Sequence, residues 1–170
     1  MKARLIVSLV IALMLVAVLA APAMAAEQGV GASVTVTEYI SCTITDNGAG
    51  GLNFGSLDPG TTDEPEADQD GAGAVTIVVS ADTNVDCDIE VKATDFTYST
   101  YTIAITDAKY GITSTLGSAT AFAAADTYYT LDTSTAGAAK TVDVWHWLSI
   151  PGGQEAGSYS STFTYQVSKS

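Results

Sequence analysis

The chain carries little positive charge. It has six Lys and Arg residues against 19 Asp and Glu residues, which gives a formal net charge of −13. Its only arginine is Arg4. Surfaces that bind nucleic acid or anionic lipid headgroups need clustered Lys and Arg. We therefore expect no nucleic-acid partner, and the charge balance favours cations or basic or neutral polymers instead.

Groups that could act together in catalysis are also scarce. The chain has one histidine, His146, and no G-x-S-x-G-like signature accompanies it. Glycoside hydrolysis would need two positioned carboxylates, and the many acidic residues single out no pair. The sequence therefore predicts a protein that is not an enzyme.

The N-terminal residues have the pattern of a Sec signal peptide. Lys2 and Arg4 precede an apolar run over residues 5–21, and Pro22 breaks it before the small-residue stretch Ala-Met-Ala at 23–25. The run is shorter than the ~20 apolar residues of a membrane span. We expect cleavage after Ala25 and a secreted or cell-surface chain without a transmembrane anchor. Four lysines then face 19 acids, so the net charge becomes 4 − 19 = −15.

Cysteine is limited to Cys42 and Cys87. Each shares strand parity with apolar neighbours, so both side chains are predicted to point to the apolar side of their strands. Two thiols in a small secreted domain usually pair, and a disulfide here would contribute about 4 kcal/mol in the chain-entropy model. A redox or metal-binding pair is the alternative, and the absence of C-x-x-C and of more than one histidine disfavours it.

Apolar and polar residues alternate through residues 26–170, and no long stretch has helical spacing. The sequence predicts one all-β domain, a two-layer β-sandwich of immunoglobulin-like or pilin-like type. The expected strands cover residues 30–37, 39–45, 51–57, 74–80, 85–93, 101–108, 140–149 and 159–167.

Turn signals separate these strands. Asn47-Gly48 is the sharpest of them. Residues 111–139 form a long connection, with a weak strand around Tyr129 and one short helical turn at 119–125. Tyr159 opens the last strand and resembles the corner tyrosine whose hydroxyl bonds to backbone as a strand joins a sandwich.

Residues 52–60 read Leu-Asn-Phe-Gly-Ser-Leu-Asp-Pro-Gly. Together with Cys42, Cys87 and the Gly-Ser-Tyr at 157–159, this element resembles spore-coat-U-like and fimbrial-subunit domains. The resemblance implies a pilin-like or immunoglobulin-like sandwich that builds surface fibres, commonly by lending an N-terminal strand to the next subunit.

Residues 26–37 suit such a strand. One face of this candidate donor strand carries the apolar residues Val30, Ala32, Val34 and Val36, and the other face is small and polar. A segment of this kind can fill a groove left by a missing strand, with main-chain hydrogen bonds for affinity and alternate side chains for register. The alternative is that it forms an ordinary first strand of its own domain.

Two further features have a functional and a structural interpretation. Acidic residues crowd one loop, in which Glu66, Asp68 and Asp70 could bind calcium or could simply be solvated. Trp145 and Trp147 share a strand face and could contact sugar rings, although paired aromatics on a strand are more often core residues.

The leading hypothesis is a secreted structural protein of the cell surface, a subunit of a fibre, pilus-like filament or coat. Its partners would be copies of itself or other surface proteins, and no cofactor is expected apart from the calcium alternative. The second hypothesis is a non-catalytic extracellular module that binds polysaccharide or a surface protein.

Overall fold

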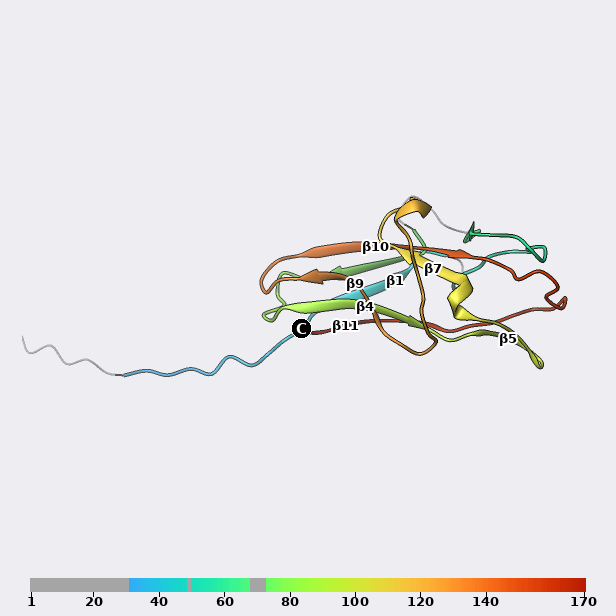
Figure 1. The fold of residues 1–170 in the computed structure, drawn as a ribbon. Coiled ribbons are helices and arrows are strands. Elements are labelled where there is room, and N and C mark those ends of the chain that lie inside the picture. Colours follow the sequence, from blue (N-terminus) through green and yellow to red (C-terminus); the bar gives the residue numbers. More distant parts are fainter. Residues whose placement is uncertain (1–30, 49, 68–72) are drawn as a thin grey trace, which may run out of the picture. The chain divides into compact units, whose positions relative to one another are not determined.

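The computed structural model describes residues 31–48, 50–67 and 73–170 (Figure 1). The chain divides into two units, Met1–Val36 and Thr37–Ser170, and all described strands belong to the second unit. The predicted signal peptide, residues 1–25, lies outside the described residues.

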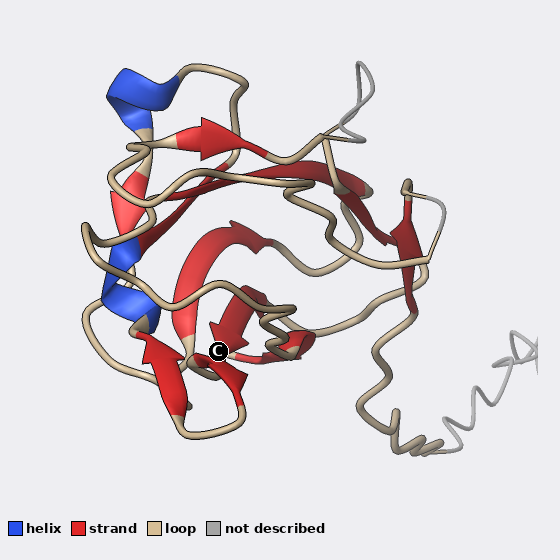
Figure 2. Ribbon diagram, turned by 90° about the vertical axis from the view of Figure 1, so that its right-hand side faces the viewer, coloured by secondary structure: helices blue, strands red, loops and turns tan. Residues whose placement is uncertain are grey.

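The second unit is all-β and sandwich-like, with antiparallel sheets (Figures 1 and 2). The larger sheet has six strands: β1 (Cys42–Asp46), β3 (Val75–Val79), β10 (Lys140–Leu148), β7 (Ala108–Gly111) and β8 (Thr120–Ala121) in that order, with β2 (Glu64–Pro65) paired to β10. The smaller sheet has the order β11 (Phe163–Lys169), β4 (Cys87–Ala93), β9 (Tyr129–Ser134). A hairpin joins β5 (Phe96–Tyr98) to β6 (Tyr101–Ile103), and two 3₁₀ turns are η1 (Ile105–Asp107) and η2 (Leu116–Ser118).

The core between the two sheets follows from the period-two patterns of β3 and β4. Alternate residues of β4 are buried, and so are alternate residues of β3. Ile77 of the larger sheet and Ile89 of the smaller sheet belong to one cluster of buried side chains, which also holds Val142 and Val144 of β10. The two sheets therefore meet across this cluster.

A second, aromatic cluster fills the core next to β7 and β9. The Tyr110 and Phe122 rings have centroids 4.7 Å apart, and Tyr129 packs on both of them. Phe122 comes from the long connection after β7 and is buried. This connection is therefore tied to the core by its aromatic side chains as well as by β8 and β9.

The strands predicted at 74–80, 85–93 and 140–149 are confirmed by β3, β4 and β10. The strand predicted at 39–45 is present as β1, and the one around Tyr129 is present as β9. The last predicted strand, 159–167, is shifted toward the C-terminus as β11.

Other sequence predictions are wrong. Residues 101–108 do not form one strand, because the Asp95 carboxylate accepts the Ile105 N–H (2.8 Å) and the chain turns at η1 between β6 and β7. The helical turn expected at 119–125 lies earlier, at η2, and β8 follows it. The turn signal at Asn47-Gly48 does follow the end of β1, but the partner of β1 is β3, and the Asn47 amide donates to Gly73 O and Thr76 Oγ1.

The tyrosine corner is confirmed. The Tyr159 hydroxyl donates to the backbone oxygen of Glu155 (2.9 Å) and accepts from the Gln154 amide (2.7 Å). The Tyr159 ring also packs on Tyr98 of the β5–β6 hairpin. These contacts hold the segment before β11 against the neighbouring hairpin.

Gly73 provides a test of this architecture. Its φ is +74°, and a Cβ at this position would lie 2.6 Å from Val144 O and 3.0 Å from the Trp145 ring. We expect Gly73→Ala to lower the free energy of unfolding by about 2 kcal/mol, measured by urea denaturation. Gly117→Ala is the control, since nothing lies within 4 Å of its Cβ position. Equal stability of the two variants would contradict the close approach at Gly73.

Candidate functional site: an open groove between two sheet edges

The inner face of β1 is not covered by the facing sheet. Ile44 lies opposite Ile77 of β3, so both side chains point to the inner side of the larger sheet. Ile77 is 0% exposed, whereas Ile44 is 41% exposed. Since every residue of β1 is exposed, this strand extends beyond the edge of the smaller sheet.

An open groove of about 1000 Å³ lies beside this uncovered strand. One side is formed by β1 and residues 50–59, and the other by residues 154–162 and the start of β11. Its lining includes the core side chains Val75, Phe96, Ile103, Leu148, Phe163 and Tyr165. In the described part of the chain, β1 pairs only with β3 and β11 only with β4. The groove therefore lies between two strands that each have one unpaired edge.

Residues 52–57 form a wall of this groove, and the strand predicted at 51–57 is wrong. Leu52, Phe54 and Leu57 are half-buried against the core, and the Phe54 ring packs edge-on to Phe96 at 6.0 Å. Gly55 has a φ of +69°, which departs from strand geometry. The segment is thus held by its apolar side chains more than by a ladder of main-chain hydrogen bonds.

Glu66 fixes the same wall. Its Oε1 accepts the Asn53 N–H (3.0 Å), and the Ala67 N–H donates to Asn53 O (2.7 Å). Glu66 is 3% exposed, so its carboxylate points into the protein. Asp68 and Asp70, the other two residues of the calcium prediction, lie outside the described residues, so the calcium site stays a prediction. Within the described ranges, no group of three or more His, Cys, Asp or Glu residues could hold a metal ion.

A buried polar pair lies behind the groove. The Tyr165 hydroxyl and His146 Nε2 are 3.1 Å apart. Complete burial lowers the pKa of His146 to about 3, so its imidazole is neutral. Burial, followed by the nearby carboxylates of Glu66 and Asp46, raises the pKa of Tyr165. Both groups stay uncharged over the usual pH range, and this allows them to lie beside an apolar core.

The two tryptophans do share the outer face of β10, as predicted. Trp147 is only 4% exposed and pairs in register with Pro65 of β2 and Lys109 of β7. Trp145 is half-buried. A sugar-binding platform made of both rings is therefore absent from this face, and the aromatic-contact hypothesis is left with Trp145 alone.

Cys42 and Cys87 are free thiols in this structure. Cys42 lies opposite the buried Val79, on the inner face, but is exposed because β1 is uncovered; Cys87 is buried. Burial raises the pKa of Cys87, with smaller contributions from Asp86 and Cys42. The inner-face orientation of both cysteines is as predicted, and their pairing remains a prediction.

Of the candidate donor strand, Ala32, Val34 and Val36 are described, and Val30 lies outside the described residues. Residues 31–37 form no strand, contrary to the strand predicted at 30–37. Val34 is 88% exposed and Val36 is 76% exposed. The side chains of these two valines are thus exposed in the described residues.

Comparison with protein-family models and with curated proteins finds no match to this chain. Among the described residues, no helix is long and apolar enough to cross a membrane. The functional argument therefore depends on the groove and on the segment that could fill it.

The buried imidazole predicts a pH dependence of stability. The pKa of His146 is about 3 in the folded chain and near 6.5 when unfolded, so only the unfolded chain takes up a proton between these values. Above pH 6.5 the His146 imidazole is neutral in both states, so it adds no pH dependence. As the pH drops from 6.5 toward 3, the free energy of unfolding falls by up to about 1.4 kcal/mol per pH unit.

Urea unfolding of the wild type and of His146→Gln between pH 7 and pH 4 measures this effect, since the difference between the two curves cancels the carboxylates. We expect His146→Gln to be less stable at pH 7 but to lose less stability on acidification. Parallel curves would mean that His146 can be protonated in the folded state.

Proposed function

We propose that this chain is a subunit of a cell-surface fibre, pilus-like filament or coat that assembles by β-strand donation. In this proposal residues 26–37 of one copy fill the groove of a second copy. The observation that supports it is the open groove between the unpaired edges of β1 and β11, lined by core side chains.

The donor segment and the groove match in chemistry. The segment offers main-chain N–H and C=O groups to an unpaired edge, and Val34 and Val36 alternate toward one face. Full burial of a valine side chain contributes roughly 1.5–3 kcal/mol, and both valines are exposed before assembly. Residues 28–37 carry no charge, so this part of the segment brings no buried charge into the groove; the one acidic residue of the segment is Glu27, near its N-terminal end.

The location and the form of the assembly follow from the same features. The N-terminal pattern of a signal peptide favours export, and the resemblance to spore-coat-U-like and fimbrial-subunit domains favours a pilin-like or immunoglobulin-like sandwich. A contact in which each copy lends a segment to the next is heterologous and does not close on itself, so it produces filaments.

A non-catalytic binding module is the alternative, and one observation favours it. Tyr98 and Tyr101 are exposed on the β5–β6 hairpin, and the Tyr98 ring packs on Tyr159 at 5.6 Å, next to the groove. Exposed tyrosines of this kind can contact sugars or another protein.

Negative-stain microscopy and size-exclusion light scattering of the exported chain test the assembly. Val34→Asp with Val36→Asp places charges on the apolar ridge and should abolish filaments, because the charges would be buried in the groove. Thr35→Asp with Thr37→Asp adds the same charge to the opposite face and should assemble as the wild type does.

Three results separate the alternatives. A monomeric wild type whose stability drops in the ridge variant would indicate that the segment fills its own groove. A monomeric wild type with no response to either variant would favour the binding module. If both variants form filaments as the wild type does, strand donation is wrong, and the copies assemble through a different surface.

We further propose that Cys42 and Cys87 pair in the exported chain. Their position on facing inner surfaces is compatible with a bond that ties β1 to β4. Under oxidising conditions Cys42→Ser should cost up to about 4 kcal/mol of unfolding free energy, and far less in reductant. Urea denaturation with and without reductant measures this difference. Two titratable thiols per unfolded chain after export would contradict the pairing.

A further inference from the structure

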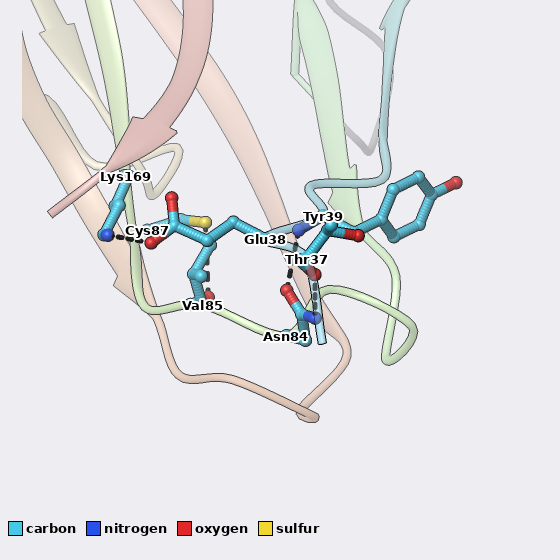
Figure 3. Close-up of polar contacts among 7 residues, drawn as sticks. All are labelled: Thr37, Glu38, Tyr39, Asn84, Val85, Cys87 and Lys169. Carbon is cyan, nitrogen blue, oxygen red and sulfur yellow. Dashed lines mark hydrogen bonds and ion pairs between the residues drawn. The ribbon is translucent and has the colours of Figure 1, made fainter. Parts of the chain in front are cut away.

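The five residues before β1 are held without belonging to a strand. Residues 37–41 begin at the last residue of the donor segment, and they are bound to residues 80–84, which lie in the connection between β3 and β4. Much of this binding comes from side chains, as Figure 3 shows for Asn84.

Asn84 bonds to both sides of Glu38. Its Oδ1 accepts the Tyr39 N–H (2.7 Å), and its Nδ2 donates to Thr37 O (2.8 Å). Its own N–H donates to Tyr39 O (3.0 Å). The side chain therefore acts as a short strand would, satisfying a donor and an acceptor of the neighbouring chain.

Neighbouring contacts hold the same stretch. Thr83 Oγ1 accepts the Ser41 N–H (3.0 Å) and lies 3.2 Å from Ser41 O, and Thr83 is buried. Glu38 forms an ion pair with Lys169 at the end of β11 (Figure 3). Both sheets thus contribute to the attachment of residues 37–41, which we call the root segment.

The attachment begins where the donor segment ends. Residues 31–36 are exposed and form no strand, whereas Thr37 is bonded through its backbone oxygen. Asn84 is itself exposed, so these hydrogen bonds compete with water and add modestly to the stability of the fold. Their geometric effect is larger, because they fix the backbone on both sides of Glu38.

We propose that Asn84 is a positioning residue that fixes the root of the donor segment and so sets the stiffness of the filament. This inference rests on the proposed function. When residues 26–36 are held in the groove of the next copy, the root segment is the covalent link between these bound residues and the rest of their own copy. Each free residue adds two soft backbone dihedrals to that connection. Anchoring at Thr37 and Tyr39 removes this freedom and leaves a connection of minimal length.

Filaments of Asn84→Ala and Asn84→Asp test the inference, with the persistence length measured from negative-stain images as the readout. Asn84→Ala removes both side-chain bonds and should shorten the persistence length several-fold while filaments still form. Asn84→Asp keeps the acceptor for Tyr39 N–H but loses the donor to Thr37 O, so an intermediate stiffness is expected.

A control separates this role from a general loss of stability. Asn47→Ala also removes two side-chain hydrogen bonds from the same unit, but away from the root segment, and should leave stiffness unchanged.

The outcomes distinguish the two proposals. If the wild type forms filaments and Asn84→Ala filaments are equally stiff, the positioning role is wrong and the proposed function stands. The positioning role is also wrong if Asn47→Ala softens filaments as much as Asn84→Ala does. If the wild type forms no filaments, both proposals are wrong.

Discussion

The structure depends on a mismatch between its two sheets. The larger sheet places its edge strand β1 beyond the edge of the smaller sheet. The inner face of β1 therefore has no strand of the smaller sheet packed against it. Two groups of atoms are left exposed as a result: apolar side chains such as Ile44, and the main-chain donors and acceptors along the outer edges of β1 and β11. A single extended segment with alternating apolar residues would cover the exposed apolar side chains and would pair with the main-chain donors and acceptors at the same time.

The walls of the groove are built so that it stays open. Phe54 is wedged against Phe96 on one side, and the Tyr159 corner holds the other side. Behind them, the hydrogen bond of Tyr165 to the neutral His146 lets a polar pair lie within the core. A groove supported in this way needs little rearrangement to receive a strand, which reduces the ordering cost of binding.

Much of the fold was predictable because alternation is a local signal. β3, β4 and β10 are buried on one face, and the apolar residues at alternate positions of their sequences predict this. Residues 51–57 place Leu52 and Phe54 at alternate positions, but they form no strand, because their side chains pack against the core and Gly55 has a positive φ. Residues 101–108 are interrupted where the Ile105 N–H donates a hydrogen bond to the carboxylate of Asp95, ten residues earlier. Only part of the candidate site was predictable. The alternation of Val34 and Val36 can be seen in the sequence, whereas the groove depends on how many strands each sheet contains.

Charge decides which forces could hold copies together. All four lysines of residues 26–170 already have partners within the chain: Lys109 with Asp63, Lys140 with Asp132, Lys169 with Glu38, and Lys92 over the Tyr128 ring. With the proposed cleavage after Ala25, each copy has a side-chain charge of 4 − 19 = −15, so copies repel one another, and their lysines already have partners within the chain. Attraction must come from apolar burial and main-chain hydrogen bonds. The uncharged residues 31–37 are suited to supply both, and salt, by screening the repulsion, would strengthen rather than weaken such a contact.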